Sequence, residues 1–158
     1  MTRADRLCFV GRFPERYAQY ILALEKDKHR GLAAEVMAYK YILPSLGCDP
    51  IAGRSAIVKS TDQVPFDVLA KWDDEFWLVE VKTGRATPNQ VQRGRMARLC
   101  DLLKERGCYV TPLLLQVNLT SIGFELLDYP STQKSPKGND GNLPGVADRV
   151  AAWIEQST

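Results

Sequence analysis

Two acids and a lysine occupy positions in this sequence where strand-forming segments usually carry apolar side chains. Residues 64–84 read VPFDVLAKWDDEFWLVEVKTG, with Asp67 in one apolar run and Glu80 and Lys82 at the end of the next. Side chains alternate across a strand, so Glu80 and Lys82 share a face, and a hairpin would bring Asp67 beside them. Two neighbouring carboxylates repel each other, and a hard divalent cation is the usual neutralising partner. The pattern therefore predicts an Mg²⁺ site, in which Mn²⁺ would substitute.

A simpler interpretation is that the strand reaches solvent at this point. Glu80 and Lys82 would then form a surface ion pair, which contributes little to stability. The apolar flanks, and the 13 residues that separate Asp67 from Glu80 with a turn between them, favour convergence of the three charges instead.

The surrounding pattern predicts the elements that would position these residues. Residues 65–71 and 75–82 form a hairpin around the turn-favouring pair Asp73 and Asp74. A helix at residues 31–43 is ended by Pro44, and a long helix at 88–106 is capped by Thr87 and closed by Gly107. The remaining expected elements are helices at 13–26 and 146–156, strands at 51–59, 109–117 and 123–129, and a flexible polar loop at 130–145.

This order of elements predicts the fold class. A helix, three strands, a helix and a strand, with further helices at both ends, indicate an α/β fold with a mixed sheet flanked by helices. The chain has 158 residues, of which 45% are hydrophobic. That is enough for one domain over residues 1–158, with its core at about 31–129.

The motifs resemble those of a nuclease superfamily. PFD at residues 65–67 followed by EVK at 80–82 looks like the PD-(D/E)XK signature, and the helix GLAAEVMAYKYILPSLG looks like that superfamily's first core helix, with its acid at Glu35. The order Glu35, Asp67, Glu80, Lys82 is similar to that of archaeal Holliday junction resolvases and small restriction and homing endonucleases. The resemblance covers about residues 31–117. It implies a restriction endonuclease-like core of αβββαβ order and a metal-dependent DNA endonuclease.

The resemblance also implies a role for each residue. Asp67 and Glu80 would hold Mg²⁺, with the backbone carbonyl of Val81 as a further ligand. Lys82 would orient or deprotonate the attacking water, or stabilise transition-state charge. Glu35 lies roughly 40° from an apolar-stripe residue on a helical wheel, so it could point to the end of the sheet. The alternative for Glu35 is an ordinary solvated helix glutamate.

The helix at residues 88–106 adds polar candidates. Gln92 and Arg95 fall inside its apolar arc, near the point where Lys82 leaves the strand, and we expect them to reach the site unless both simply meet solvent. The arc is defined by Val91, Leu99, Leu102 and Leu103. RecB-like nucleases follow such a glutamine with a tyrosine four residues later; the residue here is Met96, so that motif is absent. A basic surface beside the site would bind DNA through Arg85, Arg93, Arg95 and Arg98.

Composition excludes several classes and leaves two functions open. Four cysteines without a CxxC pair and the single His29 make a zinc site improbable. No apolar run approaches the roughly 20 residues of a membrane span, so we expect a cytoplasmic protein without a membrane partner. An endonuclease that cuts both strands is expected to be a homodimer or larger. The alternative to a DNA endonuclease is a nuclease-fold module that binds nucleic acid or protein without cutting; a glycosidase would leave Lys82 without a task.

Overall fold

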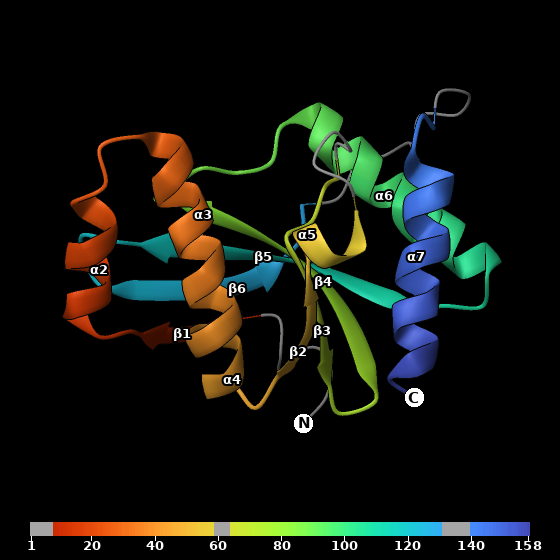
Figure 1. The fold of residues 1–158 in the computed structure, drawn as a ribbon, viewed down its shortest axis with the longest axis horizontal. Coiled ribbons are helices and arrows are strands. Elements are labelled where there is room, and N and C mark those ends of the chain that lie inside the picture. The colour runs from red at the N-terminus through yellow and green to blue at the C-terminus, as the bar shows by residue number, and fades with distance from the viewer. Residues whose placement is uncertain (1–7, 59–63, 131–139) are drawn as a thin grey trace.

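The computed structural model describes residues 8–58, 64–130 and 140–158, which form a six-stranded mixed sheet flanked by helices (Figure 1). The strands lie in the order β1-β6-β5-β4-β3-β2. Every neighbouring pair is antiparallel except β4 and β5, which are parallel. The predicted α/β class and mixed sheet are confirmed. The strand bounds are β1 Cys8–Arg12, β2 Asp49–Gly53, β3 Val68–Trp72, β4 Glu75–Thr83, β5 Val110–Asn118 and β6 Gly123–Asp128.

The predicted hairpin of β3 and β4 is confirmed, although β3 begins later than the pattern suggested. Val68 pairs with Val79 and Trp72 with Glu75, so the turn falls at Asp73 and Asp74. Asp73 has a φ of 54°, a left-handed conformation that aspartate tolerates better than most residues. The hairpin places the start of β3 beside the end of β4, where the predicted site residues lie.

A long helix makes the crossover from β4 to the parallel strand β5. This helix, α6 Gln90–Glu105, begins at a capping box in which the side chain of Asn89 accepts the N–H of Gln92 and the Gln92 side chain accepts the N–H of Asn89. The prediction of Thr87 as the cap was therefore wrong, because the two-way bond satisfies two donors at Asn89. The first turn also projects beyond the core: Val91, predicted to face inward, is 70% exposed.

The helices before the hairpin differ from the prediction in their bounds. Residues 27–30, expected to be a break, begin a helix, and just before Pro44 this helix widens to a π-type turn, where proline removes a backbone donor. The expected strand at 51–59 is shorter: it ends at Gly53, a short helix follows, and residue 59 lies outside the described residues. The helix bounds are α2 Glu15–Leu22, α3 Asp27–Met37, η1 Ala38–Ile42, α4 Leu43–Ser45 and α5 Arg54–Ile57.

Helices cover both faces of the sheet, because successive strand residues point to opposite sides. On β4, Leu78 packs towards α6 and α7 Leu143–Gln156, whereas Trp77 and Val79 pack towards α2, α3 and η1. Figure 1 shows α2 and α3 together on the left and α6 and α7 together on the right. Throughout the described ranges, each helix is too short or too polar for a transmembrane segment.

The two ends of the described chain complete this arrangement. Residues 8–12 form an edge strand, β1, that pairs with β6. The last helix begins at Leu143, three residues earlier than expected, and it buries Val150 and Ile154 in the core beneath α6. Most of the predicted loop at 130–145, namely 131–139, lies outside the described residues.

Candidate active site

Asp67 continues the β3–β4 ladder with its side chain. The backbone N–H of Asp67 donates to the Val79 carbonyl at 2.8 Å. The next N–H of β4 on the side of β3, that of Val81, donates to Asp67 Oδ2 at 2.7 Å. The carboxylate thus accepts a bond that a backbone carbonyl would accept in a regular ladder. A backbone bond to a carboxylate is stronger than one to a neutral oxygen. The carboxylate is therefore fixed against β4, and its Oδ1 lies 3.9 Å from the guanidinium of Arg54.

Glu80, on β4, lies next to Asp67. At 4% exposed, it is the most deeply buried charged residue of the described chain. The hydroxyl of Tyr129 donates to Glu80 Oε2 at 3.3 Å. Lys82 Nζ lies 3.5 Å from Oε1, but not in hydrogen-bonding geometry, so within the described residues Oε1 accepts no hydrogen bond. A buried carboxylate oxygen that accepts no hydrogen bond is costly. The Lys82 ammonium offsets part of this cost, and a bound cation would stabilise the oxygen further.

The environment of Glu80 favours its protonated form when no metal is bound. Burial raises the pKa of Glu80 above its ordinary value, and the neighbouring Asp67 carboxylate raises it further, whereas Lys82 and the Tyr129 hydroxyl oppose the shift. Burial and the contact with Glu80 likewise raise the pKa of Tyr129. Tyr129 therefore remains a neutral hydrogen-bond donor.

Glu35 reaches the same place from helix α3, on the other side of the sheet. Its carboxyl is in hydrogen-bonding contact with the side chain of Asp67. Burial, with this contact and the charge of Asp67, raises the pKa of Glu35 to about 8, while Arg54 opposes the shift. Arg54 lies 3.9 Å from both carboxylates. Glu35, Arg54 and Asp67 line a cavity of about 220 Å³ that opens to solvent.

The structure thus brings together Glu35, Asp67, Glu80 and Lys82, the four residues whose order suggested the site. The N–H of Val81 is committed to Asp67. The sequence also predicts Gln92 in this group. Its side-chain oxygen instead accepts the N–H of Asn89 at 2.9 Å. The helix cap explains that difference, since an N3 glutamine reaches back to the cap residue.

The four predicted DNA-binding arginines lie in different surroundings. Arg98 forms a two-bond ion pair with Asp140, at 2.7 and 2.9 Å, and Arg95 donates to Asn142 at 2.9 Å. Both arginines hold the segment before α7, and the ion pair with Arg98 lowers the pKa of Asp140. Arg85 is exposed just beyond β4. The positive charge of Arg93 opposes the rise in the pKa of Tyr129.

Arg54 and Tyr129 are the site residues that sequence reasoning missed. Arg54 carried a signal, because with Gly53 it interrupts the strand-like run at residues 51–59. Its backbone N–H donates to the Asp67 carbonyl at 2.8 Å, which holds the start of α5 against the residue that precedes β3. Tyr129 carried no signal, since it follows β6 as an apolar residue would, and only the pairing of β6 with β5 brings it to Glu80.

The donor set suits a hard cation with few protein ligands. Asp67 and Glu80 are each held through one oxygen, by Val81 and Tyr129. Mg²⁺ is commonly bound by one or two carboxylates while it keeps several waters. Among the described residues, no group of three or more His, Cys, Asp and Glu side chains is arranged as a metal cage. A site that depends on water and substrate oxygens would form no such cage, so the residues fit Mg²⁺ better than a fully protein-bound metal.

Comparison of the sequence with models of known protein families and with curated proteins finds no match. The case for a function therefore rests on the fold and on the geometry of this site.

Proposed function

We propose that this protein is a metal-dependent DNA endonuclease with a restriction endonuclease-like fold. The observation that carries the proposal is the anchoring of both strand carboxylates. Asp67 Oδ2 is held by Val81 and Glu80 Oε2 by Tyr129, and within the described residues Glu80 Oε1 accepts no hydrogen bond. Buried carboxylate oxygens normally accept a hydrogen bond, so Glu80 Oε1, which has the Lys82 ammonium 3.5 Å away but no such bond within the described residues, supports a cation-binding role for this carboxylate.

The topology supports the fold part of the proposal. The meander β2–β3–β4, the crossover helix α6 and the parallel strand β5 follow the helix, three-strand, helix, strand order that the resemblance implies. Helix α3, which carries Glu35, precedes the meander as the first core helix should. Strand β1 and helix α7 are additions at the two ends.

Asp67 and Glu80 would hold Mg²⁺, with the Val81 carbonyl as a further ligand and Mn²⁺ as a substitute. When bound, the cation supplies positive charge for the phosphate oxygens and makes a bound water more acidic. Lys82, whose ammonium lies beside Glu80, positions the attacking water or binds a phosphate oxygen. Glu35 holds a proton next to Asp67. Arg93 and the exposed Arg85 supply positive charge for the DNA backbone.

A cleavage panel tests this proposal. Plasmid, four-way junction, flap and single-stranded DNA are incubated with Mg²⁺, with Mn²⁺ and with chelator. We expect metal-dependent cleavage that falls at least about a hundredfold in Asp67→Ala, Glu80→Ala and Lys82→Ala. The exposed residues Lys28 and Glu155 provide charge-matched alanine controls. Cleavage in chelator, or full activity of Asp67→Ala, would contradict the proposal, and DNA binding without any cleavage would indicate the non-cutting module.

We also propose that the endonuclease acts on DNA in the cytoplasm as a homodimer, since one domain carries one site and cuts one strand at each encounter. The apolar residues at 6–13 and those of the last helix are the two candidate surfaces for dimerisation, and the last helix packs its apolar residues into its own domain. The edge strand β1, with Val10 at 68% exposed, remains available for pairing between copies. Light scattering at micromolar concentration tests this, and a monomer that still makes double-strand breaks would refute it.

A further inference from the structure

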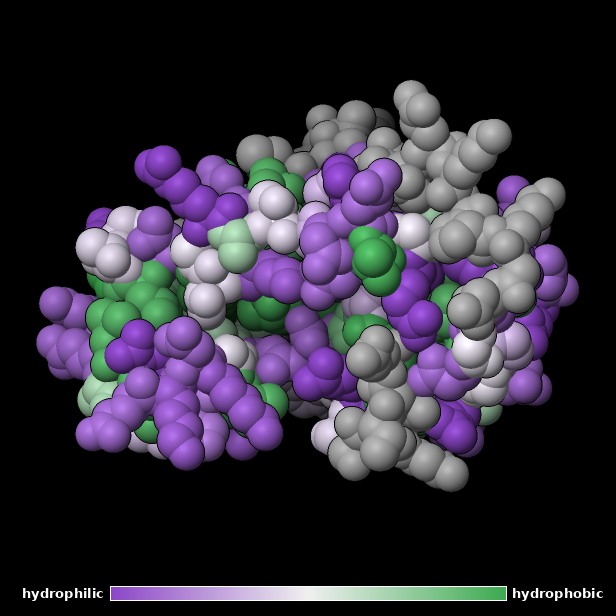
Figure 2. Space-filling view, turned by 90° about the horizontal axis from the view of Figure 1, so that it is seen from above, coloured by the Kyte–Doolittle hydropathy of each residue, from purple (hydrophilic) through white to green (hydrophobic). Residues whose placement is uncertain are grey.

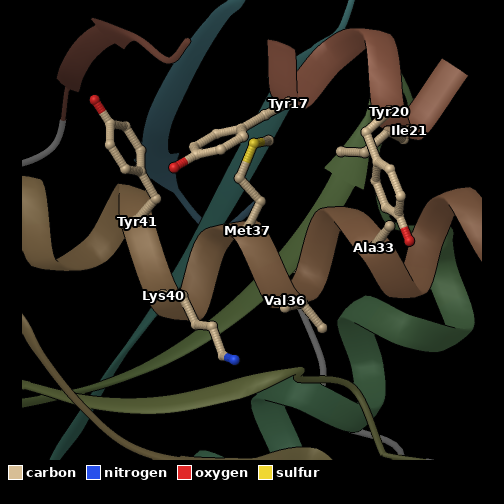
Figure 3. Close-up of a pocket in the computed structure, with 8 residues that line it drawn as sticks. All are labelled: Tyr17, Tyr20, Ile21, Ala33, Val36, Met37, Lys40 and Tyr41. Atoms are coloured by element: carbon tan, nitrogen blue, oxygen red, sulfur yellow. The ribbon is translucent and has the colours of Figure 1, made fainter.

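A second pocket, separate from the carboxylate site, lies between α2 and the helix formed by α3 and η1. Its volume is about 400 Å³. Figure 3 shows Tyr17 and Tyr20 extending from α2, Met37 rising towards the Tyr17 ring from the helix below, and Tyr41 on the other side of that ring. The lining is largely aromatic and aliphatic, and the proposed catalytic residues do not contribute to it.

Aromatic rings in this pocket are both held in place and open to solvent. Tyr17 is fixed by an edge-to-face contact with Tyr41, with ring centroids 5.4 Å apart, and by the guanidinium of Arg16, 5.0 Å from the Tyr17 ring centre. Tyr20 is 67% exposed and Val36 is 53% exposed. Figure 2 shows hydrophobic atoms at this end of the molecule, flanked by hydrophilic ones. A preformed aromatic pocket that remains open is typical of a ligand site.

The pocket adjoins the proposed active site. Val36 lines both this pocket and the cavity of Glu35 and Asp67. The two hollows therefore lie on either side of one helix, α3, and Glu35 directly precedes Val36 in the chain. A strand of DNA with a phosphate at the carboxylates needs only to pass over Val36 for a neighbouring nucleotide to reach the tyrosines.

The charges at the pocket fit an anionic occupant. Lys40 lines it, on the same side of the helix as Val36 (Figure 3), and Arg16 covers Tyr17. Neither cation forms an ion pair with a carboxylate among the described residues. Aromatic faces for stacking beside cations for the backbone are the means by which proteins bind single-stranded nucleic acid. A protein partner would need a contact of roughly 800 Å², whereas this hollow has the size of a small-ligand site.

We propose that the pocket between α2 and α3 binds an unpaired nucleobase of the strand whose phosphate lies at Asp67 and Glu80. The inference rests on the proposed nuclease function and narrows its substrate: the preferred DNA has an unpaired nucleotide beside the scissile phosphate, as single strands, flaps and distorted junctions do. A fully paired duplex would have to extrude a base to fill the pocket, which costs unstacking energy.

Binding measured in chelator tests the pocket without cleavage. The probe is a short single-stranded oligonucleotide, prepared intact, with one abasic position, or with one fluorescent base analogue whose emission changes on stacking. We expect Tyr20→Ala to bind the intact strand about fivefold to a hundredfold more weakly, as the loss of one base–aromatic stack does. Tyr20→Trp should restore binding. Tyr109→Ala is the matched control, because Tyr109 is 72% exposed and does not line the pocket.

The decisive result is the coupling between base and ring. Moving the abasic position along the strand should weaken binding by the unmutated protein at one position, and Tyr20→Ala should be insensitive to that position. Equal binding of intact and abasic strands, or equal losses in Tyr20→Ala and Tyr109→Ala, would overturn the inference. Base-dependent binding that persists in a protein inactive with Mg²⁺ and Mn²⁺ would instead refute the nuclease proposal and leave the pocket assignment standing.

Discussion

Replacing Glu35 by glutamine should change how the stability of the metal-free protein depends on pH. In the folded protein Glu35 keeps its proton up to a pKa of about 8, against 4.5 for the ordinary group. The folded state therefore binds more protons than the unfolded state between these values, so the free energy of unfolding is largest below about pH 4.5 and falls as the pH rises through about 8. The amide of the Glu35→Gln variant would be neutral at every pH and can still donate a hydrogen bond to Asp67.

The magnitude follows from the shift. Each tenfold change in an acid constant corresponds to about 1.4 kcal/mol, so a pKa moved from 4.5 to about 8 sets an upper limit of about 5 kcal/mol for the whole window. The Glu35 side chain is 21% exposed and Arg54 lies 3.9 Å away. The opposing charge of Arg54 is already included in this pKa. Water screens the partly exposed carboxylate, so we expect roughly 2–3 kcal/mol of lost stability in the unmutated protein.

Urea unfolding followed by circular dichroism from about pH 5 to about pH 9 measures the effect. The unmutated protein should lose stability across this range. Glu35→Gln should lose much less, keeping the slopes that Glu80 and, near pH 9, the buried thiols of Cys48 and Cys100 contribute. At about pH 9 the variant should therefore be the more stable protein. Glu155→Gln, at an exposed position of α7, is the control for removing a carboxylate. Parallel profiles for the unmutated protein and Glu35→Gln would refute the reasoning.

Four further outcomes follow from the same contacts. Millimolar Mg²⁺ should raise the melting temperature at about pH 8 more than at about pH 5, where protons compete for the carboxylates; an equal rise at both pH values would argue against a carboxylate site. Glu80→Gln should keep or raise the metal-free melting temperature while losing the Mg²⁺ response, and a large metal-free drop would make Glu80 structural. Tyr129→Phe should cost about 1–2 kcal/mol by leaving Glu80 Oε2 unpaired, with urea unfolding as the measurement and Tyr109→Phe as the control; no loss would show that the bond is unimportant. Ile154→Ala should cost roughly 2–4 kcal/mol without changing the mass measured by light scattering, and dissociation of an oligomer instead would restore the last helix as an interface.

The sequence predicted the hairpin and its charged residues because both depend on local rules. Alternation along β4 places Glu80 and Lys82 on one face, and the pair Asp73–Asp74 ends one strand and begins the next. Because Asp67 lies just before the first strand of the hairpin, the pairing of the two strands places it beside the end of β4. The convergence of Asp67, Glu80 and Lys82 therefore follows almost entirely from the local sequence of the hairpin.

Helix boundaries and some side-chain destinations were harder to predict. The cap lies at Asn89, not Thr87, and engages the side-chain oxygen of Gln92, while Asn142 and Asp140, before α7, bind Arg95 and Arg98. These bonds involve competition among several donors and acceptors of similar quality. The local sequence pattern does not show which of these partners a side chain will bind, because that depends on which backbone segments lie side by side in the fold.

By itself, the sequence determined the class of fold, the order of its elements and the acids and lysine at the end of the hairpin, since periodicity and turn chemistry act over a few residues. The tertiary structure alone decided the surroundings that give those residues their chemistry. It placed Tyr129, 49 residues from Glu80 in the chain, against that carboxylate, and Arg54 between Glu35 and Asp67. Burial and electrostatic fields arise from groups that are distant in sequence and close in space, so the raised pKa values of Glu35 and Glu80 exist only once the sheet and both helix layers have assembled.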